Sequence, residues 1–190
     1  MRVRPENITQ MDGLIAPRHS EVTLKIREKI EQAQETASNR ELGVLKELLS
    51  DSLHKDGLFQ ECLDALSAAT DIYVGYNDLK ALTRLCNKAG CTNFVMNRYK
   101  EAIELFERQT SYGMEGKKVV AACQGMTNKG VVMLLTADQE GAISTIKEAM
   151  GLLEQEVRGG GARSEDGWSE ATAKKPVYRF PTKLTTFYTE

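Results

Sequence analysis

One pattern of residues recurs three times along the chain at a fixed spacing of 40 residues. Three stretches align without gaps: HKDGLFQECLDALSAA from His54, FVMNRYKEAIELFERQ from Phe94 and LLTADQEGAISTIKEA from Leu134. In each stretch a small residue is followed by an aliphatic residue and, four places past the small one, by a large apolar residue. The small residues are Cys62, Ala102 and Ala142, and the large ones are Leu66, Phe106 and Ile146. Self-similarity at a period of this size is typical of a repeat array.

Each repeat contains a second small residue twelve places before the first, and the two predict a helical hairpin. These upstream positions are Ser50, Gly90 and Gly130. Antiparallel helices joined by a short turn approach closely only where side chains are small, so we expect Gly90 to face Ala102 and Gly130 to face Ala142. The turns contain Gly57, Asn97 or Ala137. No single hairpin buries its apolar face alone, so the hairpins must stack. The pattern therefore predicts an all-α fold, an α-solenoid of antiparallel helix-turn-helix repeats.

The arrangement of small, aromatic and large apolar residues resembles that of tetratricopeptide repeats (TPRs). The stretch NRYKEAIELFERQ, Asn97 to Gln109, carries this resemblance most clearly. A period of 40 is similar to the longer variety found in kinesin light chains and Leu-Gly-Asn-repeat adaptors. In that variety the second helix runs on before the next unit starts, and Asp71 to Gly90 looks like such a junction.

Outside the three repeats, the stretch from Ser20 to Ala37 predicts one more amphipathic helix. We expect it to be half of a fourth, degenerate repeat or a capping helix, with Val22 and Ile26 in the places of Cys62 and Leu66. Seven main helices result. The domain organisation is an extended arm over 1–19, the extra helix over 20–38, three hairpins over 39–157, and a Gly-rich linker with an irregular tail over 158–190.

The predicted tail is rich in aromatic residues and contains two prolines that a helix cannot run through. Its aromatic residues are Tyr178, Phe180, Phe187 and Tyr188. Two interpretations stay open. The tail folds back onto the solenoid, or it is a docking peptide for a partner and orders on binding.

The sequence offers little for catalysis or for ligand chemistry. Four cysteines without a CxxC pair and only two histidines argue against a metal site. The glycine triplet Gly159–Gly161 lacks the flanking residues of a phosphate loop. A net charge of -2 gives no basic field for nucleic acid, and no apolar run is long enough to span a bilayer. We expect a cytoplasmic protein, with association with the cytoskeleton left open, that is not an enzyme and binds no cofactor.

The resemblance to TPR proteins implies that the first helices of the repeats form a concave face that holds a peptide or a helix of another protein. The residues expected on it are Glu47, Asp51, His54, Arg84, Asn87, Cys91, Val95, Gln124, Thr127, Val131 and Leu135. Some TPR co-chaperones hold a carboxylate-ended tail with Lys and Asn on these helices. Glu47 and Asp51 would repel such a tail, which argues against that partner.

These observations favour a non-catalytic protein–protein interaction scaffold or adaptor. The alternative is a structural subunit of a large cytoskeletal or ciliary assembly, held by its terminal arms. A small-molecule site is a third hypothesis, which ligand-dependent stabilisation would reveal.

Overall fold

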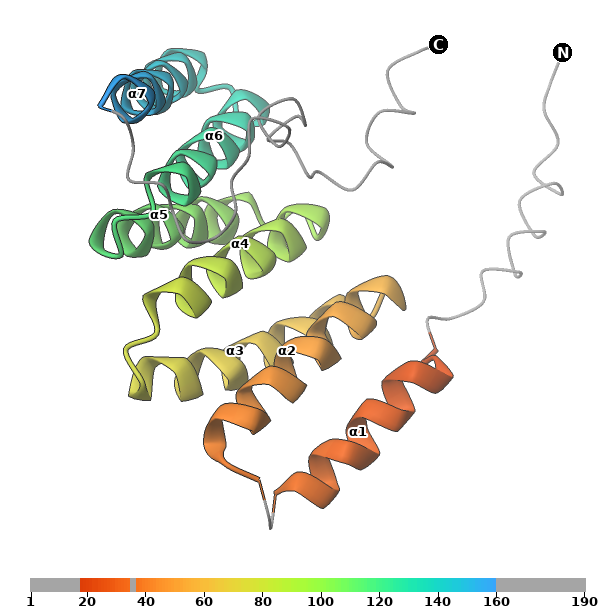
Figure 1. The fold of residues 1–190 in the computed structure, drawn as a ribbon. Helices are drawn as coiled ribbons and strands as arrows, with labels where there is room; N and C mark the ends of the chain where they lie inside the picture. Colours follow the sequence, from red (N-terminus) through yellow and green to blue (C-terminus); the bar gives the residue numbers. More distant parts are fainter. Residues whose placement is uncertain (1–17, 35–36, 160–190) are drawn as a thin grey trace, which may run out of the picture.

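The computed structural model describes residues 18–34 and 37–159, and this part of the chain is all-helical. Seven helices follow one another: α1 Glu21–Ala33, α2 Asn39–Lys55, α3 Phe59–Gly75, α4 Leu79–Val95, α5 Tyr99–Glu115, α6 Val119–Leu135 and α7 Gln139–Arg158. They stack in chain order, from α1 at the bottom of Figure 1 to α7 at the top. The predicted fold class and the predicted number of main helices are confirmed.

A residue in the left-handed backbone region ends each helix from α2 to α6, and these residues lie 20 positions apart. They are Gly57, Asn77, Asn97, Lys117 and Ala137, with φ between 49° and 76°. At each turn the next N–H donates back to a carbonyl five residues earlier; Leu58 donates to Leu53 at 2.9 Å and Asp138 to Met133 at 3.0 Å. This hydrogen bond defines the Schellman motif, which satisfies carbonyls that a helix end leaves without partners.

The turns divide each repeat of the array into two halves of equal length. Helices α2 to α6 are all 17 residues long, whether they come first or second in a hairpin. The expectation that the second helix runs on is therefore wrong: α3 ends at Gly75, and Asn77 turns the chain directly into α4. The turn between hairpins is built like the turn within them.

Contacts between consecutive hairpins differ along the stack. Helix α5 lies so close to α6 that a Cβ added to Gly113 would meet the backbone nitrogen of Ala122 at 2.8 Å. One added to Gly125 would meet the carbonyl oxygen of Phe106, also at 2.8 Å. The contact between α3 and α4 is looser. At the corresponding positions, 40 residues earlier in the chain, the side chains at this contact are larger: Tyr73 corresponds to Gly113, Leu82 to Ala122 and Leu85 to Gly125. Side-chain size thus sets the separation of the hairpins.

The expected small-residue contacts inside the hairpins are confirmed only in part. Gly130 does lie against α7. A Cβ added to it would contact the side chain of Ile146 and would lie 3.3 Å from the Ala142 carbonyl oxygen. The nearest atoms to a Cβ added at Gly90 belong to the Phe106 ring, at 2.6 Å, and not to Ala102. In the second hairpin the glycine therefore makes room for a large ring, which is fully buried there.

Helix α1 joins the stack in a register that differs from the predicted one. Val22 is 60% exposed, whereas its neighbour Thr23 is fully buried and Ile26 is partly buried in the core. Thr23 donates a hydrogen bond to the Asp56 carboxylate at 2.6 Å and contacts the Ser52 hydroxyl at 2.7 Å. The assignment of Val22 to the place of Cys62 is therefore wrong by one residue. Polar contacts with the end of α2 fix the start of α1.

No helix in the described ranges is long and apolar enough to cross a membrane. The predicted N-terminal arm, except for residues 18–19, and nearly all of the predicted linker and tail lie outside the described residues. The four aromatic tail residues Tyr178, Phe180, Phe187 and Tyr188 are among them.

The left-handed turn residues lead to a first prediction. Ala137 is exposed and has a φ of 64°, a conformation that a Cβ disfavours, so Ala137→Gly should stabilise the fold by about 0.5–1 kcal/mol. The reverse change Gly57→Ala, at a φ of 76°, should destabilise it by about 1–2 kcal/mol. Urea unfolding followed by circular dichroism measures both. Equal effects of the two changes would contradict the assigned turns.

The close approach of α5 to α6 leads to a second prediction. Gly113→Ala should destabilise the protein by about 1–3 kcal/mol, because the new methyl group meets backbone atoms that cannot move aside. The control is Gly151→Ala, where no atom lies within 4 Å of an added Cβ. That change should stabilise α7 by about 0.5–1 kcal/mol through helix propensity alone. The packing would be in doubt if both variants shifted the unfolding midpoint in the same direction.

Candidate binding surface

The first helices of the three hairpins, α2, α4 and α6, approach one another on one side of the stack. A cluster of four charged residues joins α2 to α4, and we name it the charged cluster: Glu47, Asp51, Arg84 and Lys88. Arg84 donates two hydrogen bonds to the Glu47 carboxylate, at 2.6 and 2.7 Å. Lys88 contacts both carboxylates, at 2.8 Å for Glu47 and 2.7 Å for Asp51. Three of the predicted concave-face residues therefore contact one another or a shared lysine.

Glu47 is the most enclosed member of the charged cluster, with a side chain only 11% exposed. Burial raises the pKa of this carboxyl group, but the hydrogen bonds and positive charges of Arg84 and Lys88 oppose that effect. The net result is a pKa below the ordinary value of 4.5. Glu47 is thus a paired anion in the folded protein.

The same contact recurs one unit further along with neutral side chains. Asn128 of α6 donates to the Asn87 side-chain oxygen of α4 at 2.9 Å. These residues follow Lys88 and Glu47 by 40 positions, so the amide pair occupies the place of the ion pair. Polar contacts therefore connect all three first helices and order the middle of the predicted face.

Near the C-terminal ends of α4 and α6 the residues of this face are apolar. Leu135 is 50% exposed and Leu134 is 45% exposed, while Val131 and Val95 are half-buried. Cys91 is also half-buried, and burial raises the pKa of its thiol to about 11. A thiol in that state is a poor nucleophile at neutral pH, so Cys91 contributes packing and not reactivity.

The remaining predicted residues, Gln124, Thr127 and His54, belong to the first helices α6 and α2. Gln124 and Thr127 of α6 are half-buried, and the Thr127 hydroxyl donates to the Cys123 carbonyl within its own helix. His54 contacts the Thr92 hydroxyl at 3.2 Å and packs edge-on against Phe59. Burial lowers the pKa of His54, and the Asp51 charge opposes that shift only partly. His54 is therefore a neutral, packed side chain at pH 7.

Sequence reasoning missed two residues that organise this face, Lys88 and Asn128. The signal that could have found them is a spacing one position longer than the repeat, from Glu47 to Lys88 and from Asn87 to Asn128. The pairing also changes the argument against a carboxylate-ended tail. Two cations match the two carboxylates of the charged cluster, so it carries no net charge that would repel an anion.

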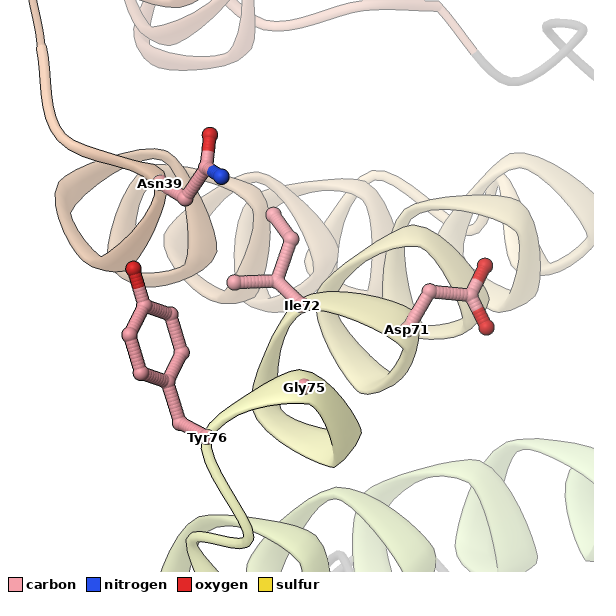
Figure 2. Close-up of a pocket in the computed structure, with 5 residues that line it drawn as sticks. All are labelled: Asn39, Asp71, Ile72, Gly75 and Tyr76. Carbon is pink, nitrogen blue, oxygen red and sulfur yellow. The ribbon is translucent and has the colours of Figure 1, made fainter.

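One hollow in the described part of the chain lies where α3 ends beside the start of α2. Asn39, Asp71, Ile72, Gly75 and Tyr76 line it. Figure 2 shows Ile72 between Asp71 and the pair formed by Asn39 and Tyr76, with the Asp71 carboxylate turned away from the ring. The Asp71 carboxylate therefore does not share one point of the hollow with Asn39 and Tyr76. Within the described ranges, no group of three or more His, Cys, Asp or Glu residues is placed to hold a metal ion.

Comparisons with known proteins bear on the fold. No protein-family model matches the sequence, and no curated protein matches it significantly. Among solved structures, the chain is similar to BtubC (BKLC) from P. vanneervenii, with a TM-score of 0.63 and 14% sequence identity. The likeness covers 77% of this chain and 60% of BtubC, so the chain spans less than two thirds of that protein. At this identity the likeness establishes a shared helical-repeat fold.

The charged cluster leads to a third prediction, on the pH dependence of stability. The pKa of Glu47 is lower in the folded protein than in the unfolded chain, so its contribution is present above pH 4.5 and is lost as pH falls below that value. Glu47→Gln should destabilise the protein at pH 7 by about 1 kcal/mol, a modest figure because solvent screens the half-exposed Arg84. Between pH 5 and about 3, the free energy of unfolding of the Glu47→Gln variant should fall less than that of the wild type.

The matched control for this prediction is Glu148→Gln on the exposed side of α7. Its stability should follow the wild-type curve at each pH, as measured by thermal unfolding. A Glu47→Gln curve parallel to the wild-type curve would show that the pair contributes nothing that depends on pH.

Proposed function

We propose that the protein is a non-catalytic interaction scaffold that holds a segment of another protein against α2, α4 and α6. The surface formed by these three helices is the observation that supports this proposal most directly. It combines a satisfied polar cluster with exposed apolar side chains at one end. Such a surface offers an apolar anchor with polar groups beside it, as peptide-binding grooves do.

The chemistry of the surface suggests what the bound segment looks like. Leu135 and Val131 at the α6 end suit an apolar residue of the partner, which loses contact with water on binding. Asn87 and Gln124 in the middle suit backbone or amide hydrogen bonds. The charged cluster at the other end is internally paired, so it favours polar partners over a strongly charged one. A short helix or an extended peptide with one apolar end fits this order.

We further propose that the repeats are TPR-like units with the 40-residue period of the long variety, although their second helices α3 and α5 are no longer than their first helices. We also propose that the protein is cytoplasmic and binds neither nucleic acid nor cofactor. The recurrence of the repeat, the left-handed turns and the likeness in fold to BtubC support the first part. Membership in a multi-subunit complex agrees with a scaffold role. The aromatic residues of the C-terminal segment are proposed as a second docking element.

The fourth prediction tests the concave face. The full chain is immobilised, incubated with extract of its native cells, and its retained proteins are quantified by mass spectrometry. Leu135→Asp should reduce recovery of the specific partner at least tenfold, because a charge replaces the apolar anchor. Val74→Asp is the matched control, since Val74 is 53% exposed but lies on the second helix α3.

The control variant should recover the partner as the wild type does. Thermal unfolding of both variants checks that each remains folded. Equal recovery by Leu135→Asp and the wild type would exclude this end of the face as the binding surface.

A further inference from the structure

The last described helix, α7, exposes an apolar stripe next to the side that packs against α6. Its members are Ile143, Ile146, Met150, Leu153 and Val157, spaced alternately three and four residues apart. Ile143, Met150 and Val157 are 51%, 57% and 79% exposed, and the other two are half-buried beside α6. We name these five residues the α7 stripe. Side chains in this spacing are typical of a helix that packs lengthwise against another helix.

The repeat itself shows that the α7 stripe is a packing surface. Met150 occupies the position that Thr110 has in the preceding repeat. Thr110 lies at the contact of α5 with α6, where its hydroxyl donates to the Ala122 carbonyl at 3.4 Å. Helix α7 sits at the upper end of the stack in Figure 1, and no described helix follows it. The terminal unit of a solenoid normally has a polar outer face, whereas three residues of the α7 stripe expose apolar side chains.

Charged residues beside the stripe indicate what covers it. Lys147 and Glu154 are both exposed and lie seven residues apart, one on either side of Met150 in the sequence. When two α7 helices pack antiparallel with a twofold axis near Met150, Lys147 of each copy lies beside Glu154 of the other. Ile143 of each copy then lies beside Val157 of the other. The surface is therefore complementary to itself in both charge and apolar contact, as a twofold interface requires.

We propose that the protein forms an antiparallel homodimer through the α7 stripe. This surface is separate from the one formed by α2, α4 and α6 and does not depend on the function proposed for that face. The stripe is about 20 Å long, so the interface is at the small end of specific protein contacts. The dimer is therefore expected to dissociate at micromolar concentrations.

The fifth prediction uses charge reversal on the full chain, measured by sedimentation velocity between about 1 and 200 µM. Lys147→Glu alone places two pairs of like charges across the axis, as does Glu154→Lys alone. Each change should weaken self-association at least tenfold. An equimolar mixture of the two variants should recover it, because the two substituted side chains then face each other with opposite charges. The unchanged Glu154 of the first variant likewise faces the unchanged Lys147 of the second. Native mass spectrometry identifies this mixed dimer.

Glu148→Lys is the control, because Glu148 is exposed on α7 but lies off the stripe, and it should dimerise as the wild type does. Met150→Glu, placed at the axis, should give a monomer with unchanged helix content. A wild type that stays monomeric up to 200 µM would overturn the proposal. So would a dimer that survives both single reversals, or a mixture of the two variants that does not associate. A monomeric wild type would instead point to coverage of the stripe by another part of the chain or by a different protein.

Discussion

A residue with a left-handed backbone conformation recurs every 20 positions, and the rest of the fold depends on this constraint. Five such turns reverse the chain after each helix from α2 to α6. They also limit each of these helices to 17 residues. Because these helices have the same length, equivalent residues of successive repeats fall at the same height on successive first helices. That alignment places Lys88 beside Glu47 and Asn128 beside Asn87 without any further specification.

The polar contacts on the first helices complement the uneven packing of the second helices. Tyr73, Leu82 and Leu85 make the contact of α3 with α4 looser than that of α5 with α6, where two glycines and an alanine meet. The charged cluster bridges α2 and α4 across this looser junction. A pair of amides takes the place of the charged cluster between α4 and α6, whose hairpins already meet closely at the contact of α5 with α6. Part of the predicted binding face therefore also holds the hairpins together, and a partner there contacts groups that are already satisfied.

The sequence predicted the fold well because the repeated residues are those that packing constrains. Its limits have physical causes. The bend after α5 was predicted at Gly113 and Gly116, but the left-handed residue is Lys117, because the side chain there does not mark the position and only the backbone angle relates it to Gly57. Lys88 was missed because its equivalents are Leu48 and Asn128. The register of α1 was predicted wrongly because the buried polar contacts of Thr23 with Ser52 and Asp56, and not an apolar residue, set it.

The greater length of α7 follows from the same turn constraint. Position 157 is where the next left-handed residue would fall, and it is occupied by valine, whose branched Cβ excludes that conformation. The helix continues to Arg158 instead of turning, so α7 is 20 residues long and no described hairpin partner covers it. Valine at this position thus lengthens α7 and adds to its exposed apolar side. Since that side belongs to a second helix and the concave face to first helices, a contact at one leaves the other open. Two copies joined through α7 would present two such faces, and a partner with two matching segments would bind more tightly than either face alone allows.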